Sequence, residues 1–434
     1  MFLFALAQLF VPTAAAVTLA DALRAADDNG VDLALLRERT ESDATLRGQA
    51  WSLVQPKLVL GGSYTRNEYG IELDFSSMIP EELAPFLGDS SFEPISVLKE
   101  EYWAYNVSIV QPLFNGSAIP LLRGAYDTVA ASRADADDLR TQVHAGIARA
   151  YYGVVVAREG ERVADRALTS ARRHAELARA AVAAGTAPPT ARLQGEISVA
   201  RAERELLSAR EGRVSAELAL AELTGLASDV PVETPTPPEI PWASPDEALD
   251  AAARRPAIVA AELRARAARM QGVATGLGWL PTIDGRFTWS YSGNTGFSDD
   301  PSMWMVVVEA DWVLWDGGYR IAEQRRAAVQ ARMAKLAGDK TRLDTEERVR
   351  GLWEKHASAV AGLVAVERER ALSEENTRIA ATAFEAGLVT LLELEDARLG
   401  LQAAELALLS TRMERDLAAI DLLAAVGRRL PGAP

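Results

Sequence analysis

The sequence predicts an internally duplicated α+β membrane protein, in which the strands of a shared transmembrane β-barrel accompany long coiled-coil helices. Three observations favour this fold class: an apolar N-terminal segment typical of an export signal, two halves that share one order of elements, and four strands of alternating apolar and polar residues. Four strands cannot close a barrel, because about eight are the minimum, so copies of the chain must share one. Side chains fill an eight-stranded barrel, and an open channel therefore favours a trimer with about twelve strands.

The N-terminus has the pattern of a secretory signal. Residues 1–11 are almost wholly apolar, and Pro12 and Ala14-Ala15-Ala16 follow them. This order is typical of a hydrophobic region and a small-residue cleavage site, so we expect a signal peptide over 1–16. The alternative is a buried N-terminal helix. No other apolar run approaches the ~20 residues that a membrane-spanning helix needs, and a membrane crossing is therefore expected through strands.

Charge and composition exclude several classes of function. The chain has 434 residues and a formal net charge of −15, which disfavours binding to nucleic acid. It has no cysteine, so disulfides, thiolate zinc sites and cysteine nucleophiles are excluded. The three histidines, His144, His174 and His356, lack the spacing of a paired metal site, and no phosphate-binding glycine loop is present. We therefore expect no catalysis, no cofactor and no metal site.

Matching motifs indicate that the two halves of the chain follow one plan. Residues 111–117, QPLFNGS, match residues 312–318, WVLWDGG, at an offset of 201. Upstream, Pro56 matches Pro281 at an offset of 225. The change of offset places roughly two dozen extra residues between the two strands of the first half.

A proline-rich stretch divides the repeats and predicts an extended linker rather than a helix. The expected divisions of the chain are a signal peptide (1–16), a first repeat (17–225), the linker (226–245), a second repeat (246–427) and a C-terminal tail (428–434). Each repeat is expected to hold a shorter helix, a β-hairpin and a long helical hairpin. In chain order these lie over about 19–53, 57–113 and 118–225 in the first repeat, and about 246–276, 281–314 and 319–427 in the second.

Long stretches rich in Ala, Leu, Glu and Arg predict long helices over about 118–184 and 319–386. At about 1.5 Å per residue, each helix would span roughly 100 Å. Gly185 and Gly387 are expected to end these helices, because glycine is common just past a helix C-terminus. Return helices are expected to follow and to pack against them as coiled coils. A soluble antiparallel coiled coil would show the same helical pattern.

Alternation of apolar and polar residues is sharpest at 283–291 and recurs at 103–109 and 304–314, and it is weakest at 58–65. In the first of these segments, Ile283, Phe287, Trp289 and Tyr291 oppose Asp284, Arg286, Thr288 and Ser290. The pattern suits a half-buried strand, and aromatic residues at the ends favour a barrel strand with an apolar outer face. The alternative is an ordinary antiparallel sheet that packs on a core.

An acidic loop is expected between the first two strands, over about 68–101. Long outer loops are typical of membrane barrels. We interpret its acidic residues as a solvated surface, and binding of a receptor or a divalent ion is the alternative.

Four motifs resemble those of TolC-like outer-membrane factors, the outer membrane efflux protein family. They are QPLFNG at 111–116, AYY at 150–152, WDGG at 315–318 and AGLVTLLELEDA at 386–397. The resemblance implies a homotrimer in the outer membrane, in which a twelve-stranded transmembrane β-barrel is continuous with a long α-helical coiled-coil barrel in the periplasm. It also implies a passive exit duct of a tripartite efflux pump or a type I secretion system.

The partners that the resemblance implies are a periplasmic adaptor protein, an inner-membrane pump of the RND or ABC type, and outer-membrane lipid. The alternative function is that of a soluble periplasmic coiled-coil protein, similar to an adaptor. Such a protein would have no use for four duplicated, aromatic-rich strands.

The same resemblance implies three groups of site residues. Glu393 and Asp396, which share a helix face, match acidic positions at the periplasmic constriction, where a trimer would carry rings of carboxylates. A solvated helix surface is the alternative for these two acids. The hairpin tips that would contact the adaptor are Gly185, Thr186, Gly387, Leu388, Val389 and Thr390, and the strand–helix junctions are Pro112, Asn115, Gly116, Asp316, Gly317 and Gly318. The first tip departs from the family pattern at Pro188-Pro189.

Overall fold

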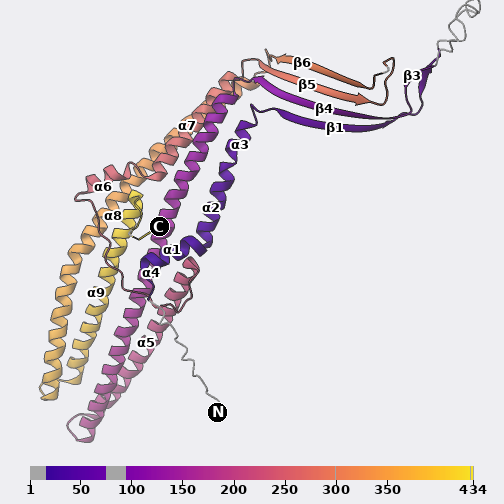
Figure 1. Ribbon diagram of the computed structural model, residues 1–434. Helices are drawn as coiled ribbons and strands as arrows, with labels where there is room; N and C mark the ends of the chain where they lie inside the picture. The colour runs from indigo at the N-terminus through magenta and orange to yellow at the C-terminus, as the bar shows by residue number, and fades with distance from the viewer. Residues whose placement is uncertain (1–15, 75–93, 299, 431, 434) are drawn as a thin grey trace, which may run out of the picture. The chain divides into compact units, whose positions relative to one another are not determined.

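A computed structural model describes residues 16–74, 94–298, 300–430 and 432–433 (Figure 1). The chain forms two compact units, and each takes segments from both repeats. The first unit holds the described residues up to Ser42, Ala131–Glu262 and the chain from Leu336 onward; the second holds the described residues of Asp43–Ala130 and Leu263–Lys335. Nearly all of the expected signal peptide and the centre of the acidic loop lie outside the described residues.

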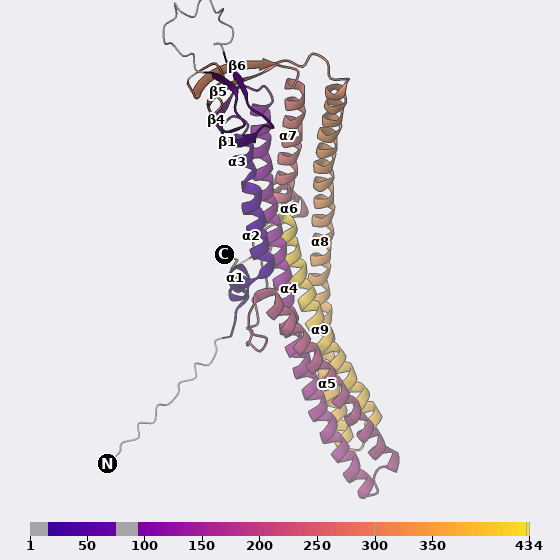
Figure 2. The ribbon, with the colours of Figure 1, turned by 90° about the vertical axis from the view of Figure 1, so that its right-hand side faces the viewer.

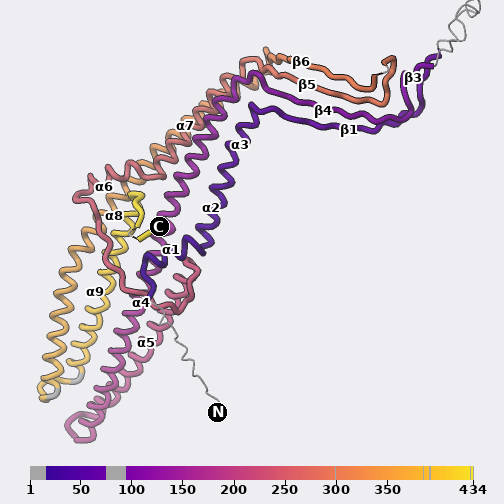
Figure 3. Tube along the Cα trace, viewed as in Figure 1, coloured from indigo at the N-terminus to yellow at the C-terminus, as the bar shows by residue number. Residues whose placement is uncertain are grey.

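Four long helices form two helical hairpins, whose paths Figure 3 traces. The first hairpin consists of α4 (Ala118–Ala183) and α5 (Pro189–Thr224), and the second of α8 (Tyr319–Glu385) and α9 (Leu391–Val426). The outgoing helices have 66 and 67 residues, and both return helices have 36. These matched lengths agree with an internal duplication. Within each hairpin the two helices lie side by side (Figures 1 and 2).

None of the helices in the described part of the chain combines the length and the apolar character needed to cross a membrane.

The shorter helices are more broken than the sequence predicts. Instead of one helix over 19–53, the chain forms α1 (Leu19–Asn29), α2 (Val31–Ala44) and α3 (Leu46–Trp51). Gly30 interrupts the first two with an extended backbone, at φ −69° and ψ 126°.

The helix expected over 246–276 is also divided, into α6 (Pro245–Ala252) and α7 (Pro256–Leu277). Pro256 explains this break, because it has no N–H to donate and disfavours the helical conformation of the residue before it. The start of α6 agrees with the sequence pattern, since the Glu247 amide donates to the Ser244 hydroxyl at 3.3 Å.

The second unit contains an antiparallel sheet in the order β1-β4-β5-β6. Its strands are β1 (Lys57–Arg66), β4 (Glu101–Phe114), β5 (Thr282–Ser292) and β6 (Ser302–Asp311). The last strand was expected to reach residue 314 and stops three residues earlier. A second sheet of β2 (Ile71–Leu73) and β3 (Ile95–Leu98) was not expected, because such short strands carry too few residues to show alternation.

The register of the sheet gathers its apolar residues on one face. Directly opposed residues of antiparallel strands share a face. One row across all four strands is Leu60, Val107, Trp289 and Trp304, and the next is Leu58, Ile109, Phe287 and Val306. The intervening row, Val59, Ser108, Thr288 and Met305, lies on the opposite face. The sheet therefore has an apolar face and a mixed, more polar face.

Tyr151, the first tyrosine of the AYY motif, anchors the start of the described chain to α4. Tyr151 is fully buried, and its hydroxyl lies 2.8 Å from the carbonyl oxygen of Val17 and 2.6 Å from that of Glu233. Burial raises the pKa of Tyr151 to about 12, so the hydroxyl keeps the proton that it donates. Val17 also pairs with Val232 in a parallel bridge. The linker and the N-terminal segment therefore lie next to each other and both contact Tyr151 of α4.

A buried ion pair joins three helical segments of the first unit. The guanidinium of Arg255, which precedes α7, donates from Nε and Nη2 to the two carboxylate oxygens of Asp138 in α4, at 2.7 and 2.9 Å. Arg255 is 8% exposed and Asp138 is 5% exposed. Thr345 of α8 lies 3.5 Å from Arg255 Nη1. Because a charge left alone in such a site would be costly, both partners are needed for this packing.

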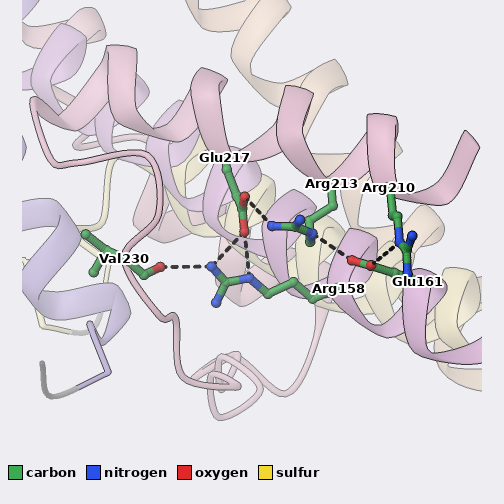
Figure 4. A network of polar contacts seen from close by, with 6 residues as sticks. All are labelled: Arg158, Glu161, Arg210, Arg213, Glu217 and Val230. Carbon is green, nitrogen blue, oxygen red and sulfur yellow. Dashed lines mark hydrogen bonds and ion pairs between the residues drawn. The ribbon is translucent and has the colours of Figure 1, made fainter. Parts of the chain in front are cut away.

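A second polar network ties α4, α5 and the linker together (Figure 4). Glu217 of α5 is 7% exposed and accepts from Arg158 at 2.9 and 2.7 Å and from Arg213 at 2.7 Å. Arg213 also donates to Glu161 at 2.6 Å. Arg158 reaches the carbonyl of Val230 at 2.9 Å, so the network holds the linker as well as the hairpin.

Replacement of Tyr151 by phenylalanine should destabilise the first unit by about 1–2 kcal/mol, because the buried donor shared by two backbone carbonyl groups is lost. Tyr152→Phe is the matched control, since the Tyr152 hydroxyl makes only a 3.5 Å contact with the carbonyl of Thr236. Urea unfolding gives the free energy, and limited proteolysis should show faster cleavage beside Val17 in Tyr151→Phe alone. Equal effects of the two substitutions would contradict this account.

Candidate functional site

The apolar face of the sheet is a candidate membrane-facing surface, because its large side chains are exposed. Leu60 is 73% exposed, Trp304 68% and Val306 61%. An exposed apolar surface that spans several strands marks an interaction site rather than ordinary protein surface. From Ile283 to Tyr291, eight residue steps of about 3.3 Å give about 26 Å of strand, which at a tilt of about 40° covers about 20 Å of the apolar band of about 25 Å on membrane barrels.

Aromatic residues lie at both ends of this face. Tyr64, Trp103, Tyr105 and Tyr291 form a series of ring contacts with centroid separations of 5.0, 6.2 and 6.2 Å. At the end where the strands meet the helices, the Trp312 indole donates to the carbonyl of Trp279 at 3.1 Å. Aromatic side chains are enriched at both interfaces of membrane barrels, and the two groups fit that arrangement.

The strand–helix junctions use one device twice. At the start of α4, the side-chain oxygen of Asn115 accepts from the amide and the hydroxyl of Ser117, at 3.1 and 2.7 Å. At the start of α8, Asp316 accepts from the amide of Gly318 at 3.2 Å and from the amide of Arg320 at 3.1 Å. Both side chains satisfy backbone donors that a helix N-terminus leaves free.

Arg320 is a junction residue that the sequence reasoning missed. Its guanidinium donates to Asp316 at 2.7 Å and to the carbonyl of Gly278 at 3.2 Å, and it also donates to the carbonyl of Val313. The guanidinium carbon lies 4.3 Å from the ring centroid of Trp279. Desolvation raises the pKa of the Asp316 carboxyl group, but the hydrogen bonds and the positive charge of Arg320 outweigh it and hold that pKa below its usual value. The sequence signal for this role of Arg320 was Asp316, an acidic residue four positions before it at the expected start of a helix.

The remaining junction residues turn the chain between strand and helix. Gly317 and Gly318 both have positive φ, at 70° and 88°, a region that L side chains rarely adopt. A Cβ on Gly116 would meet a Leu280 carbon at 3.2 Å. Pro112 stands where the register of β4 against β5 shifts, a position that tolerates a residue without an N–H.

The two hairpin tips have the same C-terminal cap. Gly185 and Gly387 have φ of 75° and 73°. In the first tip the amide of Thr186 donates to the carbonyl of Ala181 at 3.0 Å, and in the second the amide of Leu388 donates to Ala383 at 2.8 Å. Each glycine amide also donates three residues back, which completes the Schellman pattern. The tips differ after this point.

The second tip leads into α9 through a capping box. Thr390 Oγ1 accepts from the amide of Glu393 at 3.2 Å, while the Glu393 carboxylate accepts from the amide of Thr390 at 2.6 Å. The Glu393 carboxylate also accepts from the Thr390 hydroxyl at 2.9 Å, and the two bonds to the carboxylate, led by the one from the Thr390 backbone, lower the pKa of Glu393. In the first tip, Pro188 occupies the same position and makes no side-chain cap. The sequence pattern T-x-x-E at 390–393 could have revealed this role of Glu393.

The acidic pair predicted at the constriction lies on the surface of the chain. Glu393 and Asp396 are both exposed, and Leu394 between them is fully buried. Val389 and Thr390 flank the tip, and Leu388 is 80% exposed. In the residues that the structure describes, no group of three or more His, Asp and Glu side chains gathers as a metal site would require.

A family model described as outer membrane efflux protein matches residues 22–226 and 249–428. The fold is similar to that of the outer membrane protein VceC of Vibrio cholerae, with 19% identity over 95% of this chain and 96% of that chain, and a TM-score of 0.79. The Campylobacter jejuni outer membrane channel CmeC is 15% identical over 96% and 86% of the two chains, with a TM-score of 0.79.

The open state of the Neisseria gonorrhoeae outer membrane channel MtrE is 20% identical over 94% of this chain and 89% of that chain, with a TM-score of 0.77. No curated protein matches this sequence significantly.

The capping role of Glu393 predicts different outcomes for two substitutions. Glu393→Ala removes the acceptor for the Thr390 amide, and hydrogen exchange of the first-turn amides of α9 should become faster. Glu393→Gln keeps a side-chain oxygen that can complete the box, so its exchange should stay close to that of the unmodified chain. Amide exchange by mass spectrometry provides the measurement, and equal acceleration in both variants would show that the box does not order this turn.

Proposed function

Because this chain belongs to the outer membrane efflux protein family, we infer that it is an efflux duct of the outer membrane, and we propose that it acts passively. The predicted resemblance to this family is confirmed by the match over most of the chain. The observation that carries the function is the register of the sheet, which puts large apolar side chains on one face of all four strands and a mixed, more polar set on the other. Such a sheet can contact lipid on one side and water on the other.

A shared barrel follows from the two edges of the sheet. β1 and β6 are both edge strands of ten residues, so each leaves backbone groups without a partner in the sheet. Hydrocarbon offers these groups no hydrogen bonds, and only closure satisfies them. Each of the four strands is antiparallel to its neighbour, so β6 of one copy would also pair antiparallel with β1 of the next copy. We propose that three copies close a barrel of about twelve strands, since a smaller ring would be filled by side chains.

The helical hairpins suit the periplasmic part of this duct. We propose that the tips at 185–186 and 387–390 meet a periplasmic adaptor, which connects the duct to an inner-membrane pump of the RND or ABC type. The exposed Leu388 supports a protein contact at the second tip, because an apolar side chain 80% exposed at a turn gains from burial. For the first tip, the proposed contact with an adaptor is supported only by the glycine cap that this tip shares with the second.

A soluble periplasmic coiled-coil protein, the alternative function, is disfavoured by the family match and by the sheet itself. Such a protein would expose the tryptophan and valine side chains of β6 to water without benefit.

The two faces of the sheet can be tested with neighbouring valines. Val306 lies on the apolar face and Val307 on the opposite one, so Val306→Arg should block assembly in the membrane while Val307→Arg leaves it intact. An arginine on the lipid face costs about 2–4 kcal/mol near the middle of the bilayer, whereas a lumen-facing arginine stays in water. Detergent extraction followed by native mass spectrometry should give three chains for the unmodified protein and for Val307→Arg.

Two results would contradict this proposal. A soluble monomer or dimer that needs no detergent would exclude the shared barrel. Equal assembly of the two valine variants would show that the apolar face does not contact lipid.

The proposed acidic ring predicts a change in ion preference. Glu393→Gln combined with Asp396→Asn removes six carboxylates from a trimer but preserves the side-chain shapes and the capping box. Conductance in planar bilayers should show weaker preference for cations than in the unmodified channel. Glu374→Gln with Glu375→Gln, in α8, is the charge-matched control. If both double variants keep the original selectivity, Glu393 and Asp396 do not line the conducting path.

A further inference from the structure

A groove in the first unit gathers positive charge from both helical hairpins. It lies among α4, α8 and α9 and has a volume of about 370 Å³. Arg166, Arg173 and His174 of α4 line it together with Arg398 of α9. Of the described residues that line it, Asp165 alone carries a carboxylate. We call the groove that these four basic side chains line the basic groove.

Three nitrogen atoms of the basic groove are buried without a hydrogen-bond partner. They are Nε and Nη1 of Arg398 and Nδ1 of His174. His174 is only 7% exposed, so bulk water does not solvate its ring. Buried polar atoms are nearly always paired, because an unpaired one loses its hydration without compensation. The described chain therefore leaves hydrogen-bonding capacity unused in the wall of the groove.

The charge of the groove is also only partly compensated. Arg166 pairs weakly with Glu159 and Glu405, at 3.8 and 3.4 Å. Among the side chains that the structure describes, neither Arg173 nor Arg398 has a carboxylate within ion-pair distance. Burial, followed by the charges of Arg398 and Arg173, lowers the pKa of His174 to about 4. Burial likewise lowers the pKa of Arg398, although the negative charge of Glu395 acts to raise it. Both shifts report a positive, partly dehydrated environment.

We propose that the basic groove binds a small oxyanion with two negative charges, of the sulfate or hydrogen-phosphate type. Guanidinium groups bind such anions through paired N–H donors, and the charge of the anion would offset that of Arg173 and Arg398. The hydroxyls of Thr169 and Ser170 line the same groove and supply further donors. Water in the groove would leave the positive charge in place.

The bound anion would connect the two hairpins. Arg173 and His174 belong to the first hairpin, and Arg398 belongs to the second. An oxyanion held by both would favour the arrangement in which α4 and α9 lie together around the groove. This inference does not depend on the channel function, since it concerns one chain alone.

Neighbouring arginines of α4 provide the test. Arg173 and Arg172 are both exposed, but Arg173 lines the groove while Arg172 pairs with Glu203 of α5 at 2.9 Å. Sodium sulfate is titrated into the detergent-solubilised full chain by isothermal calorimetry, with sodium chloride holding the ionic strength constant. Saturable binding is expected for the unmodified protein and for Arg172→Gln. Arg173→Gln should bind at least tenfold more weakly.

A second pair of variants tests the contribution of α9. Arg398→Gln should also weaken sulfate binding at least tenfold, whereas Arg412→Gln, an arginine of the same helix that pairs with Glu367, should not. Circular dichroism checks that each variant is folded, and the exposed Arg173 gives a readout even if Arg398→Gln misfolds. The proposal is overturned if sulfate gives no saturable heat, or if Arg173→Gln binds it as well as Arg172→Gln does.

Discussion

Backbone hydrogen bonding at the edges of the four-stranded sheet constrains the rest of the molecule. β1 and β6 each have one side without a neighbouring strand, and the face between them is covered with apolar side chains. In water such a sheet would aggregate through its edges, and in a membrane its backbone groups would lack partners. Closure with further copies satisfies both requirements at once. The antiparallel succession of the strands and the equal lengths of the edges make that closure geometrically simple.

The junctions at Asn115 and Asp316 determine where the strands can become helices. Asn115 satisfies the amide of Ser117 directly before α4, and Asp316 satisfies the amides of Gly318 and Arg320 at the start of α8. At the second junction Arg320 adds bonds to two backbone carbonyls and stacks on Trp279. The duplicated caps therefore give both hairpins the same start. Duplicated glycine caps give them the same end.

Polar side chains supplement the apolar core in organising the helical unit. Long helices rich in alanine bury little area per residue, and specific partners then decide their pairing. The buried Arg255–Asp138 pair, the Glu217 network and the Tyr151 hydroxyl each join segments that are far apart in the sequence. The basic groove is an exception to this matching of charges. Its buried nitrogen atoms have no partner in the described chain, which is why we assign it to an anion.

The sequence alone determined the class of the protein and its repeated plan. Alternation in the strands, helix-forming composition and the paired glycines are local patterns, and each reflects the conformation of its own segment. The helix breaks at Gly30 and Pro256 were also local signals, although their effect on the expected long elements was missed. The same holds for the capping role of Glu393, which the spacing of Thr390 could have revealed.

Only the tertiary structure decided which segments meet. Sequence spacing could place Asp138 and Arg255 on helices, but not bring them within 2.7 Å of one another across 117 positions. It could not pair β4 with β5, or show that Tyr151 holds both Val17 and the linker. The basic groove was invisible for the same reason, because His174 and Arg398 come from different repeats. Such contacts depend on how long-range packing closes the chain, and no local pattern of residues encodes that closure.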